Sequence, residues 1–207
     1  MTPPGRDTDA PRRPRLAIAL SGGGTTLVNL SDHIEDGSLD AEIGCVIASN
    51  PTCKGIERAR QRGLPVHVLP RKNYSDKHAF SNELFQLCRG DGADLLCLAG
   101  FLSLLVIPDD FAGRVLNIHP SLLPKFGGKG MHGHHVHEAV IAAGETESGC
   151  TVHLADNTYD TGPILLQKAC HVLPHDTADT LAGRVFELEC DAYPQAITAH
   201  WQRLINP

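Results

Sequence analysis

Long apolar runs are the first feature that this chain lacks. No stretch approaches the roughly 20 apolar residues that a membrane-spanning helix needs, and residues 1–14 lack the apolar core of a secretory signal peptide. We therefore expect a cytoplasmic protein with no membrane partner. Residues 1–14 are interpreted as a disordered leader and residues 15–207 as a single domain, because 207 residues with 42% hydrophobic content suffice for one sizeable core.

A dense basic tract is the second missing feature. The formal net charge is −6 at pH 7, and the isoelectric point is near 6.0. Proteins whose main partner is a nucleic acid gather lysine and arginine on one face. Nucleic acid is therefore not expected as a partner, and the sequence favours small-molecule substrates. The choice between a monomer and a homodimer stays open.

Cysteine pairs of the C-x-x-C type are the third missing feature. The seven cysteines are widely spaced, and several lie in apolar runs such as residues 95–98. This pattern is typical of buried free thiols in a reducing compartment. Histidines crowd one segment, at His132, His134, His135 and His137, but no cysteine or carboxylate completes a recognisable ligand spacing there. No metal is therefore expected.

Strand-like and helix-like segments alternate along the first half of the chain. Apolar runs at residues 15–20, 43–48, 66–69 and 94–99 predict buried strands, and the segments between them follow helical spacing. Strands that are apolar throughout need helices on both faces of the sheet. The pattern predicts an α/β fold with a Rossmann-like, doubly wound, mainly parallel sheet.

The C-terminal part of the chain breaks this alternation. Strand-like runs at residues 150–154 and 164–169 lie close together in the sequence and predict an antiparallel hairpin. A helix is expected over residues 136–143. A further helix is expected after residue 180, and Pro194 is expected to begin a new one because proline lacks the N–H that continues a helix.

A glycine turn at residues 22–24 follows the first predicted strand. It does not match a dinucleotide fingerprint, because Leu27 stands where G-x-G-x-x-G requires its last glycine. Residues 49–50, after the second strand, supply no acidic side chain for a ribose, so NAD is disfavoured. Backbone N–H groups at the start of a helix still form a ready site for one phosphate.

The strongest functional signal is the run NIHPSLLP at residues 117–124, followed about forty residues later by Asp160. Asn117 and His119 come directly after an apolar strand, and open α/β sheets place their sites at the carboxyl ends of strands. An amide donor, an imidazole and a carboxylate are the groups that move an acyl group onto an amine at neutral pH. These three residues are the candidate catalytic set.

This run resembles the folate-dependent formyltransferases, which share N-x-H-P-S-L-L-P and a downstream aspartate in a D-x-G-P-I context. The resemblance covers nearly everything from residue 15 to residue 201. It includes the glycine turn, LAGF at residues 98–101, GCTVH at residues 149–153, and Glu189 shortly before a Tyr-Pro pair. In this order the motifs are highly specific.

The resemblance implies that the formyl group of 10-formyltetrahydrofolate, a co-substrate, passes to the amine of phosphoribosylglycinamide in purine biosynthesis. Asn117 would donate to the tetrahedral oxyanion, and His119, when protonated, would act as proton donor. Asp160 would favour the protonated imidazole and relay a proton. Thr151 and His153 are interpreted as orienting partners beside the site.

The resemblance also implies two binding regions. The ribonucleotide would be held by Gly22, Gly23, Gly24, Thr25, Thr26 and Glu189. The folate would lie against Lys77, Leu102, Ser103, Leu104, Leu105, Asn117, Asp156, Asn157, Thr158, Tyr159 and Asp160. No metal is needed for this chemistry.

Two other reactions stay open at this point. Thr25 and Thr26 replace the Ser-Asn pair that is common in the family, so an amino-sugar nucleotide is an alternative acceptor. Deformylases that release formate from formyltetrahydrofolate have the same catalytic trio, but they carry an additional N-terminal domain. Residues 126–133 form a longer loop than is common in the family and are interpreted as a lid over the ligands.

Overall fold

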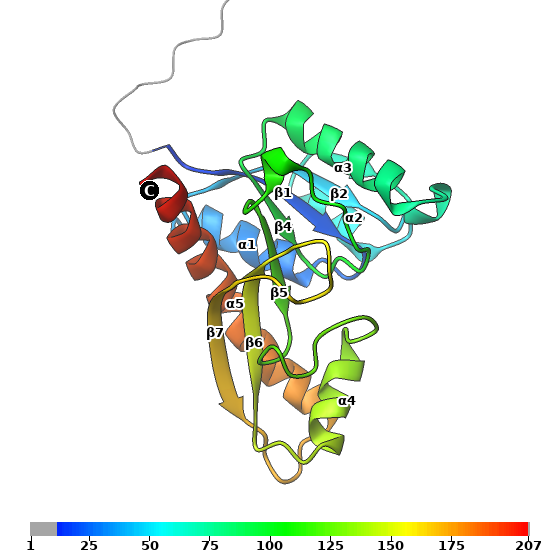
Figure 1. Ribbon diagram of the computed structural model, residues 1–207. Coiled ribbons are helices and arrows are strands. Elements are labelled where there is room, and N and C mark those ends of the chain that lie inside the picture. Colours follow the sequence, from blue (N-terminus) through cyan, green and yellow to red (C-terminus); the bar gives the residue numbers. More distant parts are fainter. Residues whose placement is uncertain (1–11, 207) are drawn as a thin grey trace, which may run out of the picture.

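The computed structural model describes residues 12–206 (Figure 1). The expected leader falls largely on residues 1–11, which lie outside the described residues. The described part of the expected leader, residues 12–14, lies against the body of the protein: Trp201 Nε1 donates a hydrogen bond of 2.7 Å to the Arg12 carbonyl. The Arg12 guanidinium also pairs with Asp94. The start of the first strand and the end of the last helix therefore lie side by side.

Within residues 12–206, seven strands form one sheet in the order β3-β2-β1-β4-β5-β6-β7. The parallel strands are β1 (Arg15–Leu20), β2 (Glu42–Ala48), β3 (Val66–Val68), β4 (Leu95–Leu98) and β5 (Val115–His119). The antiparallel strands are β6 (Glu147–Leu154) and β7 (Ile164–His171). The predicted mainly parallel sheet with an antiparallel hairpin in the C-terminal part is confirmed.

The helices are α1 (Thr25–Glu35), α2 (Lys54–Gln61), α3 (Lys77–Asp91), α4 (His134–Ala142) and α5 (Ala178–Ile205), with short 3₁₀ turns at Arg71–Asn73 and Asp109–Phe111. Side-chain caps fix two of the starts. The Asp76 carboxylate accepts hydrogen bonds from two backbone N–H groups at the start of α3, and Thr177 forms a capping box at the start of α5.

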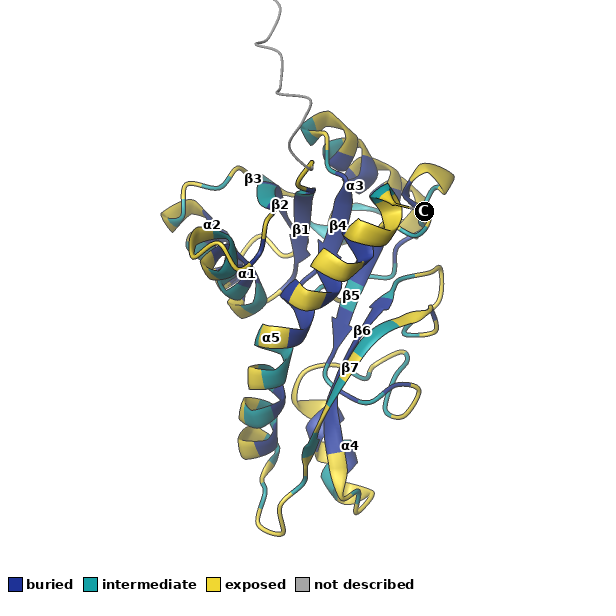
Figure 2. Ribbon diagram, turned by 90° about the vertical axis from the view of Figure 1, so that its left-hand side faces the viewer, coloured by how far each residue is buried: buried dark blue, intermediate teal, exposed yellow. Residues whose placement is uncertain are grey.

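Alternating side chains along β1 fill two cores, one on each face of the sheet. Leu16, Ile18 and Leu20 belong to the core that α1, α2 and α5 cover. Ala17 and Ala19 belong to the core that α3 covers. In Figure 2 the strands β1, β2, β4, β5 and β6 are largely buried, and the outer surface of α5 is exposed. Helices on both faces of the sheet, as predicted, are therefore confirmed.

Pro194 does not begin a new helix, contrary to the sequence-based expectation. Helix α5 runs without interruption from Ala178 to Ile205, with Pro194 inside it. A proline there removes the donor for the carbonyl four residues earlier. That carbonyl, of Cys190, instead accepts a hydrogen bond of 2.9 Å from the Asn29 side chain of α1. A tertiary contact thus replaces the missing helical bond and lets the helix continue.

All seven cysteines are free thiols, and only Cys170 and Cys190 are partly exposed. The prediction of buried free cysteines is confirmed for the other five. Within residues 12–206, no helix has the length and apolar content to cross a membrane.

Candidate active site

The candidate catalytic residues lie at the carboxyl end of β5, where the sheet changes from parallel to antiparallel. Asn117 is the partner of Leu98 on β4, on one side of β5. On the other side, β6 places His153 opposite Asn117 and Thr151 opposite His119. Two motifs that lie more than thirty residues apart in the sequence are therefore brought together by strand register.

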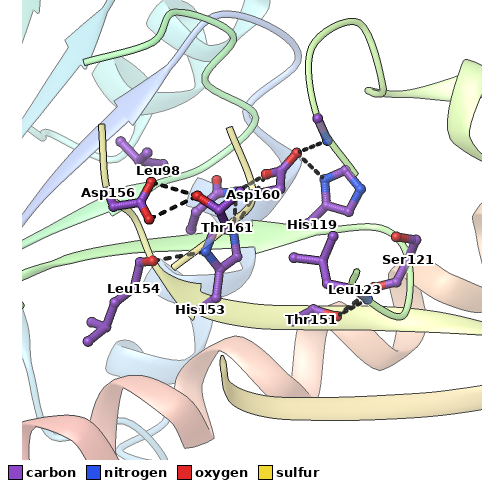
Figure 3. Close-up of polar contacts among 12 residues, drawn as sticks. Leu98, His119, Ser121, Leu123, Thr151, His153, Leu154, Asp156, Asp160 and Thr161 are labelled. Carbon is purple, nitrogen blue, oxygen red and sulfur yellow. Dashed lines mark hydrogen bonds and ion pairs between the residues drawn. The ribbon is translucent and has the colours of Figure 1, made fainter. Parts of the chain in front are cut away.

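Asp160 reaches the same point from the loop between β6 and β7. Its backbone adopts a left-handed conformation with φ +57°, which is uncommon for a residue other than glycine. Its Oδ2 atom accepts a 2.9 Å hydrogen bond from the Gly128 N–H and lies 3.6 Å from His119 Nδ1 (Figure 3). Gly162 lets this loop close, because a Cβ there would lie 1.9 Å from the Leu154 carbonyl oxygen.

The protonation of His119 is constrained by its neighbours. Its Nε2 lies 2.8 Å from the Phe126 carbonyl oxygen, which can only accept, so Nε2 carries a hydrogen. A hydrogen on Nδ1, facing Asp160, is therefore present only in the imidazolium form. Burial lowers the pKa of His119, and the charge of Asp160 opposes this shift without reversing it. The charge of Asp160 thus acts in the expected direction, but desolvation outweighs it.

Asp160 is ionised at neutral pH. Burial acts to raise the pKa of Asp160, but the adjacent His153 and His119 side chains and the Gly128 N–H outweigh burial and leave the pKa below its ordinary value. The site thus pairs a carboxylate with a histidine that is largely neutral.

His153 fixes the orientation of Asn117. The Leu154 carbonyl lies 3.0 Å from His153 Nδ1, so this nitrogen is the donor and Nε2 of the neutral ring is an acceptor. Asn117 Nδ2 donates to that Nε2 at 3.0 Å and directs its second hydrogen toward Asp160 Oδ1 at 3.4 Å. The longer bond is the weaker one, so its hydrogen is the one available to an oxyanion.

Thr151 holds the loop that follows His119. Its hydroxyl donates to the Ser121 carbonyl at 2.6 Å and accepts from the Leu123 N–H at 3.0 Å. Gln167 on β7 donates to the same hydroxyl at 2.9 Å. The roles of Thr151 and His153 as orienting partners thus agree with their contacts.

A cavity of about 620 Å³ opens beside these residues. Most of the predicted site residues line it: Thr25, Thr26, Leu102, Ser103, Leu104, Leu105, Asn117, His119, Asp156, Thr158, Tyr159, Asp160 and Glu189. Cavities of this size hold drug-sized ligands. The structure therefore brings the two predicted binding regions and the catalytic set to one pocket.

Five predicted binding residues do not line this cavity. Gly22 and Gly23 are exposed beside it, and Gly24 packs against α2, where its Cβ would lie 2.7 Å from the Gly55 Cα. Lys77 is the exposed first residue of α3. The Asn157 side chain accepts a hydrogen bond from a backbone N–H at 2.8 Å and so holds the loop.

Glu189 lies half-buried on the α5 wall of the pocket. Burial raises the pKa of this carboxyl to about 7. Phe186 and Ala182 line the same wall, one and two turns earlier respectively. Sequence analysis missed both, although their spacing from Glu189 matches one face of a helix. No sequence pattern indicated Gln167, since only its hydrogen bond to the Thr151 hydroxyl shows that it supports the loop after His119.

The glycine and histidine loop also lines the pocket. Lys129, Met131, His132, His134 and His137 all line the cavity. Among the described residues, no three histidine, cysteine or acidic side chains are grouped as a metal ion requires. The loop is thus in place to contact a ligand, and its action as a lid stays a prediction.

The sheet, the pocket and the Asn-His-Asp set together define an α/β domain suited to acyl transfer. A family profile described as formyl transferase matches residues 14–197. The chain belongs to the formyl transferase family.

Among its relatives, a chloroplastic phosphoribosylglycinamide formyltransferase of Arabidopsis thaliana is 40% identical over 192 residues, which is 91% of this chain and 66% of that protein. A trifunctional purine biosynthetic protein, adenosine-3, of Drosophila melanogaster is 40% identical over 202 residues, which is 95% of this chain. The chain spans only 15% of that second protein.

The solved structures agree with this family. A glycinamide ribonucleotide transformylase 1 from Symbiobacterium toebii has a TM-score of 0.83 and 35% identity, and the match covers 89% of this chain and 86% of that one.

Proposed function

We propose that this protein transfers the formyl group of 10-formyltetrahydrofolate to the amine of phosphoribosylglycinamide, a step of purine biosynthesis. The observation that carries the proposal is the placement of Asn117, His119 and Asp160 around one corner of the pocket, with contacts of 3.4 to 3.6 Å. The names of the Arabidopsis and Symbiobacterium relatives support this acceptor. Small-molecule substrates also suit a pocket of about 620 Å³.

The reaction begins when the acceptor amine attacks the formyl carbon. A C–N bond forms, and the formyl oxygen becomes an oxyanion that needs fixed donors. Asn117 supplies the hydrogen that it now shares with Asp160. His119 supplies Nε2–H once the loop that begins at Phe126 shifts its carbonyl away.

Asp160 completes the transfer by moving a proton. Its carboxylate takes a proton from the attacking nitrogen, and the proton passes to N10 of the folate as the old C–N bond breaks. The products are the formylated ribonucleotide and tetrahydrofolate. The low pKa of Asp160 keeps it ready to accept that proton at neutral pH.

The two substrates are assigned to opposite walls. The folate lies against residues 102–105 and the loop at residues 156–160, which offer apolar surface and backbone hydrogen bonds. The ribonucleotide lies between the start of α1, at Thr25 and Thr26, and Glu189 of α5. Its phosphate is placed beside the exposed Gly22 and Gly23 at the N-terminal end of α1.

We infer that residues 15–207 act as one domain, because both cores are built on the same sheet. A cytoplasmic location is part of the same proposal and is supported by the free thiols.

A spectrophotometric assay with 10-formyl-5,8-dideazafolate tests the proposal. Deformylation that requires phosphoribosylglycinamide is the expected result. Deformylation without an acceptor would identify a hydrolase, and deformylation that requires an amino-sugar nucleotide would identify the alternative transferase. Either outcome contradicts the proposed acceptor.

A further inference from the structure

Helix α5 contains a backbone carbonyl that its own helix cannot satisfy. Pro194 has no N–H, so the Cys190 carbonyl lacks the donor that a helix normally provides from four residues ahead. The Asn29 side chain of α1 donates to this oxygen at 2.9 Å. The bond joins residues that are 161 positions apart in the sequence.

This hydrogen bond lies between two walls of the pocket. Glu189, which lines the cavity, directly precedes Cys190. Thr25, which also lines the cavity, lies one helical turn before Asn29 on the same side of α1. The two helices pack against each other. The hydrogen bond that joins them lies one residue from Glu189 on α5 and one helical turn from Thr25 on α1.

We propose that Asn29 is a positioning residue that sets the spacing between Thr25 and Glu189 and so determines how tightly the ribonucleotide binds. The inference rests on the proposed function, which places the acceptor between these two residues. Asn29 does not line the pocket and acts only through α1 and α5.

A purely structural role predicts a different result from a positioning role. If Asn29 only satisfied the Cys190 carbonyl, any other donor would serve equally well. Replacing Pro194 by alanine restores a backbone N–H within the helix, which is such a donor. It does not restore the connection to α1. The double variant N29A/P194A therefore separates the two roles.

The experiment measures KM for both substrates, kcat and Tm for the wild type, N29A and N29A/P194A. N29A is expected to raise KM for phosphoribosylglycinamide about five- to tenfold, the effect of losing one neutral hydrogen bond. KM for the folate and kcat should stay within about twofold, since the folate is assigned to residues 102–105 and 156–160 and catalysis to the β5–β6 edge, all apart from the Asn29 contact. In N29A/P194A, Tm should recover while the acceptor KM stays raised.

Trp201→Phe is the matched control. It removes another side-chain hydrogen bond to a backbone carbonyl, that of Arg12, from the far end of the same helix. It should lower Tm and leave the acceptor KM unchanged. A rise of the acceptor KM in this control would show that any loosening of α5 has the same effect, which contradicts the inference.

Other outcomes are equally decisive. An unchanged acceptor KM in N29A, or recovery of both KM and Tm in N29A/P194A, overturns the positioning role and leaves the proposed function standing. If N29A does not fold, the acceptor KM of N29A/P194A decides alone.

If the wild type binds the ribonucleotide by calorimetry without turnover, the proposed reaction fails, and Kd replaces KM in the same comparison. A wild type that does not bind it contradicts both proposals.

Discussion

The two ends of the pocket are held together in different ways. At the catalytic end, Asn117 and His153 lie opposite each other on hydrogen-bonded strands, so backbone register fixes their spacing. At the end proposed to bind the acceptor, Thr25 lies on α1 and Glu189 on α5, and the Asn29 hydrogen bond joins these two helices. Changes at the first end should therefore alter kcat, and changes at the second should alter the acceptor KM.

Asp160→Asn should have the largest effect. The amide keeps the shape of the side chain but cannot accept the proton of the attacking amine, so we expect kcat to fall about 10²- to 10⁴-fold. KM for both substrates should change little. Steady-state kinetics test this, with Asp110→Asn as a control, because Asp110 is an exposed carboxylate paired with Arg89. A loss confined to KM would contradict the proton-transfer role.

Sequence motifs predicted the catalytic end better than the acceptor end. The run at residues 117–124 placed Asn117 and His119 at the end of a strand, because apolar strands and their carboxyl ends follow from local pattern. The position of Asn29 could not be predicted, since its importance depends on an unsatisfied carbonyl in a helix far away in the chain. The same carbonyl explains why the expected helix break at Pro194 was wrong.

The pocket shows the same division. Residues 102–105 could be assigned to the pocket from the sequence, because they follow the LAGF motif at the end of a predicted strand. The outward position of Lys77 could not, because the sequence does not show the angle at which α3 leaves the sheet.

Asn117→Ala should have the second largest effect. Removal of one oxyanion donor typically lowers turnover about 10²- to 10³-fold. His153 then loses the partner that its Nε2 accepts from, so part of the loss reflects altered orientation. Single-turnover kinetics with saturating substrates isolate the chemical step. An unchanged single-turnover rate would show that the oxyanion is stabilised elsewhere.

Glu189 should give the acceptor end a distinct pH dependence. Burial raises its pKa to about 7, so the carboxylate forms as the pH rises through 7. If the carboxylate binds the acceptor, the acceptor KM should rise about tenfold for each pH unit below 7. Glu189→Gln should raise the acceptor KM at pH 8 and remove this dependence. A wild-type profile that matches that of the variant would contradict the assignment.

The same carboxyl should affect stability with a defined sign. Its pKa is higher in the folded protein than the ordinary value of 4.5, so the folded state binds the proton more tightly. Stability from this group is present at low pH and is lost as the pH rises through 7. Glu189→Gln should therefore raise Tm relative to the wild type at pH 8 more than at pH 5. Thermal unfolding at the two pH values tests this.

Thr151→Val should have the smallest effect on catalysis and yet a clear effect on stability. The methyl group keeps the shape but leaves the Leu123 N–H and the Ser121 carbonyl without their partner, at a cost of about 1–3 kcal/mol. Turnover should fall only severalfold, because strand register still holds Asn117. Denaturant unfolding and kinetics check both parts, with Thr151→Ser as the control that keeps the hydroxyl. A loss of turnover as large as that expected for Asp160→Asn would mean that the loop contacts, and not register, hold the catalytic end.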